Sequence, residues 1–299
     1  MNLLKKWGWF FLMVMPGVVL SQYKMSVTDS LEMENLKKIF PGIGVQSDNW
    51  IKFLLLKKNG DTSIVYNEYR FTSPAMTDCP LNITLNRYIF KKEISFGGIR
   101  FKGLDFSDCV FEGNFNMSIC NSWLQINRCK FYTPIKFYVD SINNLICSDN
   151  EWNYNLTFFA CPFYNEFQFL NNKIHGLLTF EACKFDSRNI GFRSNQVSEI
   201  FFLNCELPDQ FYLYGMMPPN SKISFVNCSA KSKKPILIDL TGCDLNNVTM
   251  DYQNFKINFE NTATSSENKQ QACLNLLENF KKNGQIEDYK LLDLDGFVA

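Results

Sequence analysis

The feature that most restricts this chain is an apolar and polar pattern that recurs about every ten to twelve residues. Writing Φ for an apolar residue, each copy has the form Φ-x-Φ-x-x-C/N-x-Φ. Clean copies begin at Leu104, Leu124, Leu145, Leu156, Phe167, Leu178, Ile190, Ile200, Ile223 and Ile238. Looser copies fill the intervals and begin at Ile83, Ile94, Phe115, Ile135, Phe211 and Met250. The period is too long for a helical turn and too short for a domain, so it indicates a stack of small units.

The side chains of one copy point to the same interior only if the chain bends. Side chains alternate along an extended chain, so Leu178 and Phe180 share one face, and Cys183 and Phe185 share one face. The step from Phe180 to Cys183 changes the parity, and both pairs point inward only if a corner lies between them. Each copy is therefore expected to be two short strands and a bend. Two copies make one coil of about 22 residues, which predicts a solenoid of about eight coils.

The sixth position of every clean copy is Cys or Asn. Residues two copies apart lie on neighbouring coils, so two inward ladders are expected, one of cysteines and one of asparagines. The cysteine ladder is Cys161, Cys183, Cys205 and Cys228, and the asparagine ladder is Asn150, Asn172 and Asn195. Inward Asn can satisfy backbone groups at the corners, and Cys is a compact apolar filler.

The cysteines of the ladder are expected to be buried thiols. Neighbouring side chains on parallel coils stand about 4.8 Å apart, beyond the roughly 3.8 Å between Cβ atoms that a disulfide prefers. Cys79 and Cys273 lie outside the repeat, and a disulfide between these two remains an alternative.

Some copies resemble a known repeat. Residues 104–108 (LDFSD) and 109–113 (CVFEG) are consecutive five-residue units with a central Phe, and CKFDS and CDLNN are similar. These units resemble the pentapeptide repeat over residues 83–260. The resemblance implies a right-handed quadrilateral parallel β-helix, that is, an all-β solenoid. Most copies here have five plus six residues rather than five plus five. A longer-coiled right-handed β-helix of the pectate-lyase type is the alternative fold.

The two ends of the chain differ from the repeat. Residues 1–21 carry a basic start and an apolar stretch, which predicts a signal peptide cut before Gln22, with an uncleaved membrane anchor as the alternative. Residues 22–82 are expected to form a small α+β cap, with a helix at 30–40 and strands at 50–56 and 62–71 around a turn. Residues 261–299 are expected to be a linker followed by a helical tail, with Gly284 ending the first helix.

The composition and the motifs give little support to catalysis. Thirty basic residues balance thirty acidic ones, so there is no electrostatic reason to expect nucleic acid as a partner. His175 is the only histidine and is expected in a surface turn. We expect no metal site and no cofactor, because the cysteines follow the repeat and show no CxxC spacing.

Two functional hypotheses remain. The first is a non-enzymatic scaffold, secreted or held at the cell envelope, that presents one face to a protein or glycan partner. The second is a carbohydrate-binding or carbohydrate-active β-helix. Candidate partner-binding aromatics at outward positions are Tyr164, Phe201, Tyr212 and Tyr214.

Overall fold

The computed structural model describes residues 63–65, 69–118, 120–138, 141–187, 189–215, 221–259 and 265–294. The expected signal peptide, the expected helix at 30–40 and the expected strand at 50–56 lie outside these residues.

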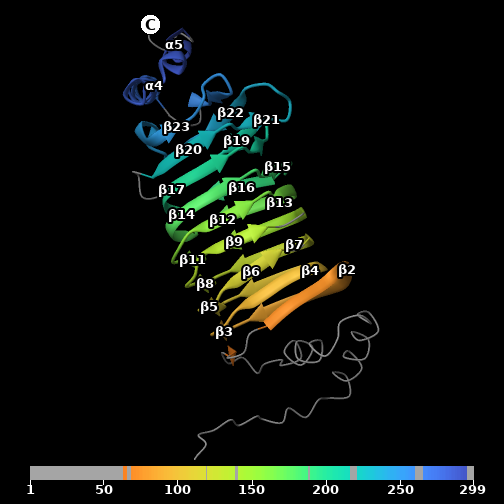
Figure 1. Cartoon of the computed structure of the whole chain (residues 1–299). Helices are drawn as coiled ribbons and strands as arrows, with labels where there is room; N and C mark the ends of the chain where they lie inside the picture. The colour runs from red at the N-terminus through yellow and green to blue at the C-terminus, as the bar shows by residue number, and fades with distance from the viewer. Residues whose placement is uncertain are drawn as a thin grey trace, which may run out of the picture. The chain divides into compact units, whose positions relative to one another are not determined.

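The described chain winds into a parallel β-solenoid of about seven turns (Figure 1). Successive coils pair in parallel, as when Leu145 pairs with Phe167 and Phe167 pairs with Ile190 on the next coil. The strands fall into four sides, which we name A, B, C and D in the order in which the chain visits them. The repeat therefore produces the coil stack that its parity predicts.

Sides A and B meet at the first corner of each coil. Side A holds the C-terminal parts of β2 (Tyr69–Asn86) and β4 (Ile94–Ser107), then β7 (Cys120–Asn127), β10 (Ser141–Ser148), β13 (Pro162–Leu170), β16 (Asn189–Arg193), β19 (Gln210–Tyr212), β22 (Ile236–Asp239) and β24 (Phe255–Ile257). Side B holds β1 (Ser63–Val65), β3 (Tyr88–Phe90), β5 (Val110–Phe111), β8 (Lys130–Phe131), β11 (Glu151–Trp152) and the starts of β14 (Lys173–Glu181) and β17 (Gln196–Leu203).

Sides C and D complete the coil. Side C holds the starts of β2 and β4, then β6 (Phe115–Ser118), β9 (Ile135–Tyr138), β12 (Leu156–Phe159), the ends of β14 (Lys173–Glu181) and β17 (Gln196–Leu203), β20 (Lys222–Val226) and β23 (Val248–Thr249). Side D holds the middle parts of β2 and β4, the starts of β7, β10 and β13, then β15 (Lys184–Phe185), β18 (Glu206–Leu207) and β21 (Ser229–Ala230).

A residue with positive φ makes the A–B and C–D corners. At the C–D corner it is Ala160, Ala182, Asn204 or Asn227, with φ between 52° and 53°. At the A–B corner it is Arg87, Asp108, Arg128, Asp149, Asn171 or Ser194, with φ between 51° and 60°. This single left-handed residue directly precedes the Cys or Asn position, and it accounts for the parity change between residues such as Phe180 and Cys183.

Stacked aromatic side chains fill the interior. On side C, Phe137, Phe158, Phe180, Phe202 and Phe225 form one column with successive ring centroids 4.9, 5.1, 5.1 and 5.0 Å apart. On side B, Phe111, Phe131 and Trp152 stack at 4.6 and 4.0 Å. The 29 Phe residues of the sequence are thus in large part the core of the coil stack.

The solenoid begins before residue 83, where the sequence pattern placed its boundary. Within the expected cap, β1 pairs in parallel with β3, and β2 pairs in parallel with β4 from Tyr69 onward. The second strand expected in the cap is therefore part of the coil stack. The Φ-x-Φ pattern is weak in this segment, so the repeat alone did not reveal it.

Two helices, α4 (Ser266–Lys282) and α5 (Ile286–Leu294), lie at the C-terminal end of the stack (Figure 1). Helix α4 begins inside the expected linker, because the Ser265 side chain caps it by accepting from the Asn268 amide at 3.2 Å. Gly284 follows the helix with φ 71°, as expected. Leu274 of α4 is exposed.

The helices satisfy backbone groups of the last coil. The Gln285 side chain donates to the Met250 carbonyl at 2.8 Å, and the Tyr252 amide donates to the Asp288 carboxylate at 2.7 Å. A parallel stack would otherwise leave these groups unpaired at its end. Among the described residues, no helix has the length and apolar character needed to cross a membrane.

Candidate functional site

The three asparagines of the expected ladder lie inside the A–B corner and are hydrogen-bonded in a continuous chain. The Asn150 side-chain amide donates to Oδ1 of Asn172 at 2.9 Å, and that of Asn172 donates to Oδ1 of Asn195 at 3.1 Å. The same oxygens accept from the Asn150 and Asn172 backbone amides. The side-chain amides also donate to carbonyls of the preceding coil, namely those of Ile126, Cys147 and Phe169.

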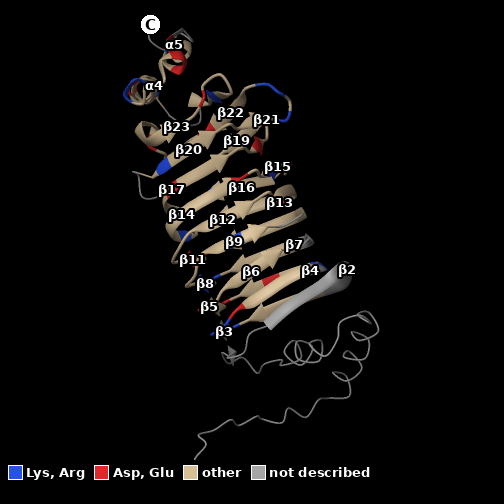
Figure 2. Cartoon of the chain, in the orientation of Figure 1, with Lys and Arg blue, Asp and Glu red and all other residues tan. Residues whose placement is uncertain are grey.

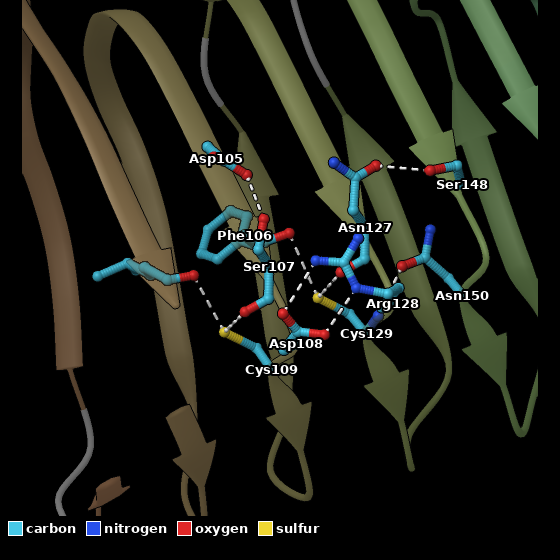
Figure 3. Close-up of polar contacts among 11 residues, drawn as sticks. Asp105, Phe106, Ser107, Asp108, Cys109, Asn127, Arg128, Cys129, Ser148 and Asn150 are labelled. Atoms are coloured by element: carbon cyan, nitrogen blue, oxygen red, sulfur yellow. Dashed lines mark hydrogen bonds and ion pairs between the residues drawn. The ribbon is translucent and has the colours of Figure 1, made fainter. Parts of the chain in front are cut away.

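Two cysteines extend this ladder toward the N-terminus (Figure 3). The Cys129 backbone amide donates to Oδ1 of Asn150 at 2.8 Å, and Cys109 occupies the same position one coil earlier. The Cys109 thiol donates to the Leu85 carbonyl at 3.2 Å. The A–B corner therefore mixes Cys and Asn, whereas the repeat suggested a ladder of asparagines alone.

The cysteines of the C–D corner use their thiols as donors. Cys183 donates to the Phe158 carbonyl at 3.3 Å, and Cys205 donates to the Phe180 carbonyl at 3.3 Å. Cys228 makes the same contact with Phe202. In each case the acceptor is the carbonyl of the last inward residue before the corner in the preceding coil. The asparagines of the A–B corner donate to the carbonyl at the equivalent position. These cysteines therefore act as hydrogen-bond donors, in addition to the apolar packing role that the sequence predicted for them.

These cysteines are buried thiols and are not joined in disulfides. Burial raises the pKa of the Cys183 thiol, and burial likewise raises that of Cys147. A buried protonated thiol is a poor nucleophile. Cys273, which could have paired with Cys79, is also a buried thiol.

Ion pairs cover the outer surface of side B. Glu151 lies 3.0 Å from the Lys130 ammonium and 3.3 Å from Nε2 of His175. Hydrogen bonds from Lys130 and then His175 hold the Glu151 pKa below its ordinary value. His175 is exposed, but it lies within β14 rather than in a turn. No group of three or more His, Cys, Asp or Glu side chains in the described ranges has the geometry to hold a metal ion.

The four candidate aromatics do not gather into one strip. Phe201 points outward from β17 on side C, whereas Tyr212 and Tyr214 belong to side A, where their rings stack at 5.9 Å. Tyr164 lies where β13 turns from side D to side A. The repeat marks these residues as outward, but the side each one occupies depends on where the corners fall.

Side C carries an outward row that the sequence pattern did not single out. Tyr138, Phe159, Glu181, Leu203 and Val226 are register neighbours on five successive coils. Each directly follows an inward Phe of the core column, which is the signal that could have identified them. We call Tyr138, Phe159, Leu203 and Val226 the apolar row.

The apolar row is accessible. Tyr138 is 50% exposed and Val226 is 42% exposed, while Phe159 and Leu203 are half-buried. The Tyr138 and Phe159 rings stack at 5.7 Å, and the Lys136 ammonium lies 4.2 Å from the Phe159 ring centroid. Figure 2 shows the strands of the stack drawn largely in tan, with most charged residues at strand ends and turns.

Comparison of the chain with family models, with curated proteins and with solved structures finds no match.

Proposed function

We propose that this chain is a non-enzymatic scaffold whose solenoid binds a protein partner through the apolar row. The observation that carries the proposal is the exposure of Tyr138 and Val226 at the two ends of a row that spans five coils and is interrupted only by Glu181 on the middle coil. An exposed, ordered apolar row on a rigid surface is a feature of protein-binding sites. Stacked aromatic side chains lose little conformational freedom on binding.

Sides B and D contrast with the apolar row. Side B carries the pair Lys130–Glu151, and side D carries Lys184–Glu206 at 3.2 Å. Such exposed pairs are solvated and contribute little binding energy. The contrast favours side C over sides B and D as the partner-binding side.

We also propose that the protein acts outside the cytoplasm, in the secreted fraction or at the cell envelope. The support is the basic and apolar start of residues 1–21. N-terminal sequencing of the exported protein is expected to begin at Gln22. A protein that retains Met1 would contradict the cleaved signal.

The coils are proposed to be lengthened relatives of the pentapeptide repeat, and hence right-handed. In the units LDFSD and CVFEG, the central Phe106 and Phe111 and the residues two positions earlier, Leu104 and Cys109, all point inward. This matches the spacing of the repeat that the units resemble.

A capture experiment tests the partner-binding surface. The immobilised protein is incubated with the extracellular or envelope fraction of its source cells. The wild type and a Tyr154→Lys control are expected to retain the same protein, and a Tyr138→Lys/Val226→Lys variant is expected to lose it. Tyr154 is a matched control because it is 51% exposed and lies outside the apolar row.

The variants must keep the wild-type melting temperature for the comparison to hold. Equal retention by the Tyr138→Lys/Val226→Lys variant would contradict the assignment to the apolar row. Release of sugar from a polysaccharide by the wild type would contradict a non-enzymatic role.

A further inference from the structure

A polar groove lies where the last coils of side C meet the C-terminal end of α4. It has a volume of about 340 Å³, within the range of small-ligand sites. One wall comes from β17, β20 and β23, and the other from η1 (Leu245–Asn247) and α4. The lining residues from the solenoid strands are Glu199, Lys222, Ser224 and Thr249, and those from the helical side are Asn246, Asn247, Asn279, Lys282 and Asn283.

A buried asparagine fixes the floor of this groove. Asn279 is 4% exposed, and its side-chain amide donates to the Leu245 carbonyl at 3.0 Å and to the Val248 carbonyl. Its Oδ1 accepts from the Asn283 side chain at 2.6 Å. These bonds hold the end of α4 against η1 and β23, so the groove is set by the fold before any ligand arrives.

Several polar side chains in the groove are available to a ligand. In the described part of the chain, the side chains of Glu199, Lys222, Ser224, Thr249 and Lys282 have no hydrogen bond or ion pair with another residue. Two ammonium groups and one carboxylate give the groove a net positive charge, and two hydroxyls lie on the strand wall. This set suits a ligand with many hydroxyl groups and at least one negative charge.

An aromatic ring flanks the strand wall. Phe201 is the register neighbour of Ser224, which in turn pairs with Thr249, so all three point outward from side C in one line. Phe201 is half-buried and keeps part of its ring accessible. A flat apolar ring beside hydroxyl, amide and ammonium groups matches a pyranose, which has one apolar face and a polar rim.

We propose that this groove binds an acidic oligosaccharide. Lys222 and Lys282 contact the sugar carboxylates, Glu199, Ser224 and Thr249 contact hydroxyl groups, and Phe201 packs against a ring face. This binding goes beyond the partner surface proposed above, because the residues of the groove are distinct from those of the apolar row.

Isothermal titration calorimetry with the mature full-length protein tests this site. The probes are tri-galacturonate and a hyaluronan tetrasaccharide, with a galactose trisaccharide as the neutral counterpart and inorganic phosphate as an anion without a sugar. The acidic sugars are expected to bind at least tenfold more tightly than the neutral sugar. Added salt is expected to lower the affinity of the acidic sugars.

Variants then assign the roles of the lysines. Lys222→Gln and Lys282→Gln are each expected to weaken an acidic sugar about fivefold, because one ionic contact is lost. Lys234→Gln is the matched control, since Lys234 is exposed and lies outside the groove. Tyr138→Lys/Val226→Lys is expected to keep the sugar affinity, which separates this site from the apolar row.

Four results would overturn the proposal. They are the absence of binding by both acidic sugars, equal binding of acidic and neutral sugars, phosphate binding as tight as that of the sugars, and equal losses in all three lysine variants. Melting temperatures close to that of the wild type ensure that a loss of affinity reports the groove rather than misfolding.

Discussion

The Asn150 side-chain amide donates to the Oδ1 of Asn172 on the next coil at 2.9 Å, and that same oxygen also accepts from the Asn150 backbone amide. One side chain thus satisfies two donors of its neighbour while its own amide bonds the Cys147 carbonyl. The left-handed residue at the A–B and C–D corners interrupts the regular ladder of strand hydrogen bonds. The inward Asn or Cys that follows donates a hydrogen bond to the carbonyl of the last inward residue before the corner in the preceding coil, so this carbonyl keeps a partner.

Replacing Asn172 by Ala is expected to destabilise the protein by about 2–4 kcal/mol. The change leaves two donors of Asn150 and one carbonyl without partners inside the core, and each such group costs about 1–3 kcal/mol before relaxation. Urea unfolding of the variant measures the loss. Asn116→Ala is the control, because Asn116 is exposed and points outward from β6, away from the inner ladder. Equal losses for the two variants would contradict a structural role for the inner ladder.

The thiols of the C–D corner are expected to resist alkylation in the folded protein. Cys183 and Cys205 are 1% exposed, and their thiols are hydrogen-bonded to carbonyls. Both should react with iodoacetamide only after unfolding, as peptide mass spectrometry would record. Cys183→Ala should cost on the order of 1 kcal/mol, and Cys183→Leu should cost more because it overpacks the neighbouring coils. Rapid labelling of the native protein, or zinc retained after dialysis, would argue against this packing.

Replacing Ala182 by Gly is expected to stabilise the protein by about 0.5 kcal/mol. Ala182 is exposed with φ 52°, a conformation that costs an L-residue about 1–2 kcal/mol and that Gly adopts freely. Gly also loses more conformational entropy on folding than Ala, and this loss offsets about 0.5–1 kcal/mol of the stabilisation. Thr179→Gly, in the strand just before the corner, should destabilise the protein instead. Chemical denaturation compares the two, and a loss of stability in Ala182→Gly would show that the corner is not strained.

Replacing Phe180 by Asp is expected to cost more than about 4 kcal/mol. The Phe180 ring is fully buried between Phe158 and Phe202, both 5.1 Å away, and the variant would place an unpaired charge there. Thr179→Asp, one residue earlier and pointing outward, should cost less than about 1 kcal/mol. Melting temperatures of the two variants check the register. Similar shifts in both would contradict the inward assignment of Phe180 and the outward assignment of Thr179.

The sequence by itself determined the coil stack and its inward residues. The alternation of strand side chains and the parity change at each bend are local properties, so they can be obtained from one copy such as residues 178–185. The same argument located the Asn and Cys positions at the corners. It missed the coils formed by β1 and β2, where few residues follow the pattern, and it missed the donor role of the thiols, which depends on a carbonyl one coil away.

Only the tertiary structure decided which outward residues become neighbours. Coils differ in length: Phe106 is paired directly with Ile126, whereas Phe211 is paired with Ile238. Phe201 and Tyr212 belong to consecutive copies, half a coil apart, and therefore lie on sides C and A. The groove beside α4 depends on Asn279 bonding the Leu245 and Val248 carbonyls, a contact between segments more than thirty positions apart. Inward positions follow from local geometry, but surface sites follow from stacking, because stacking brings together residues that no local pattern connects.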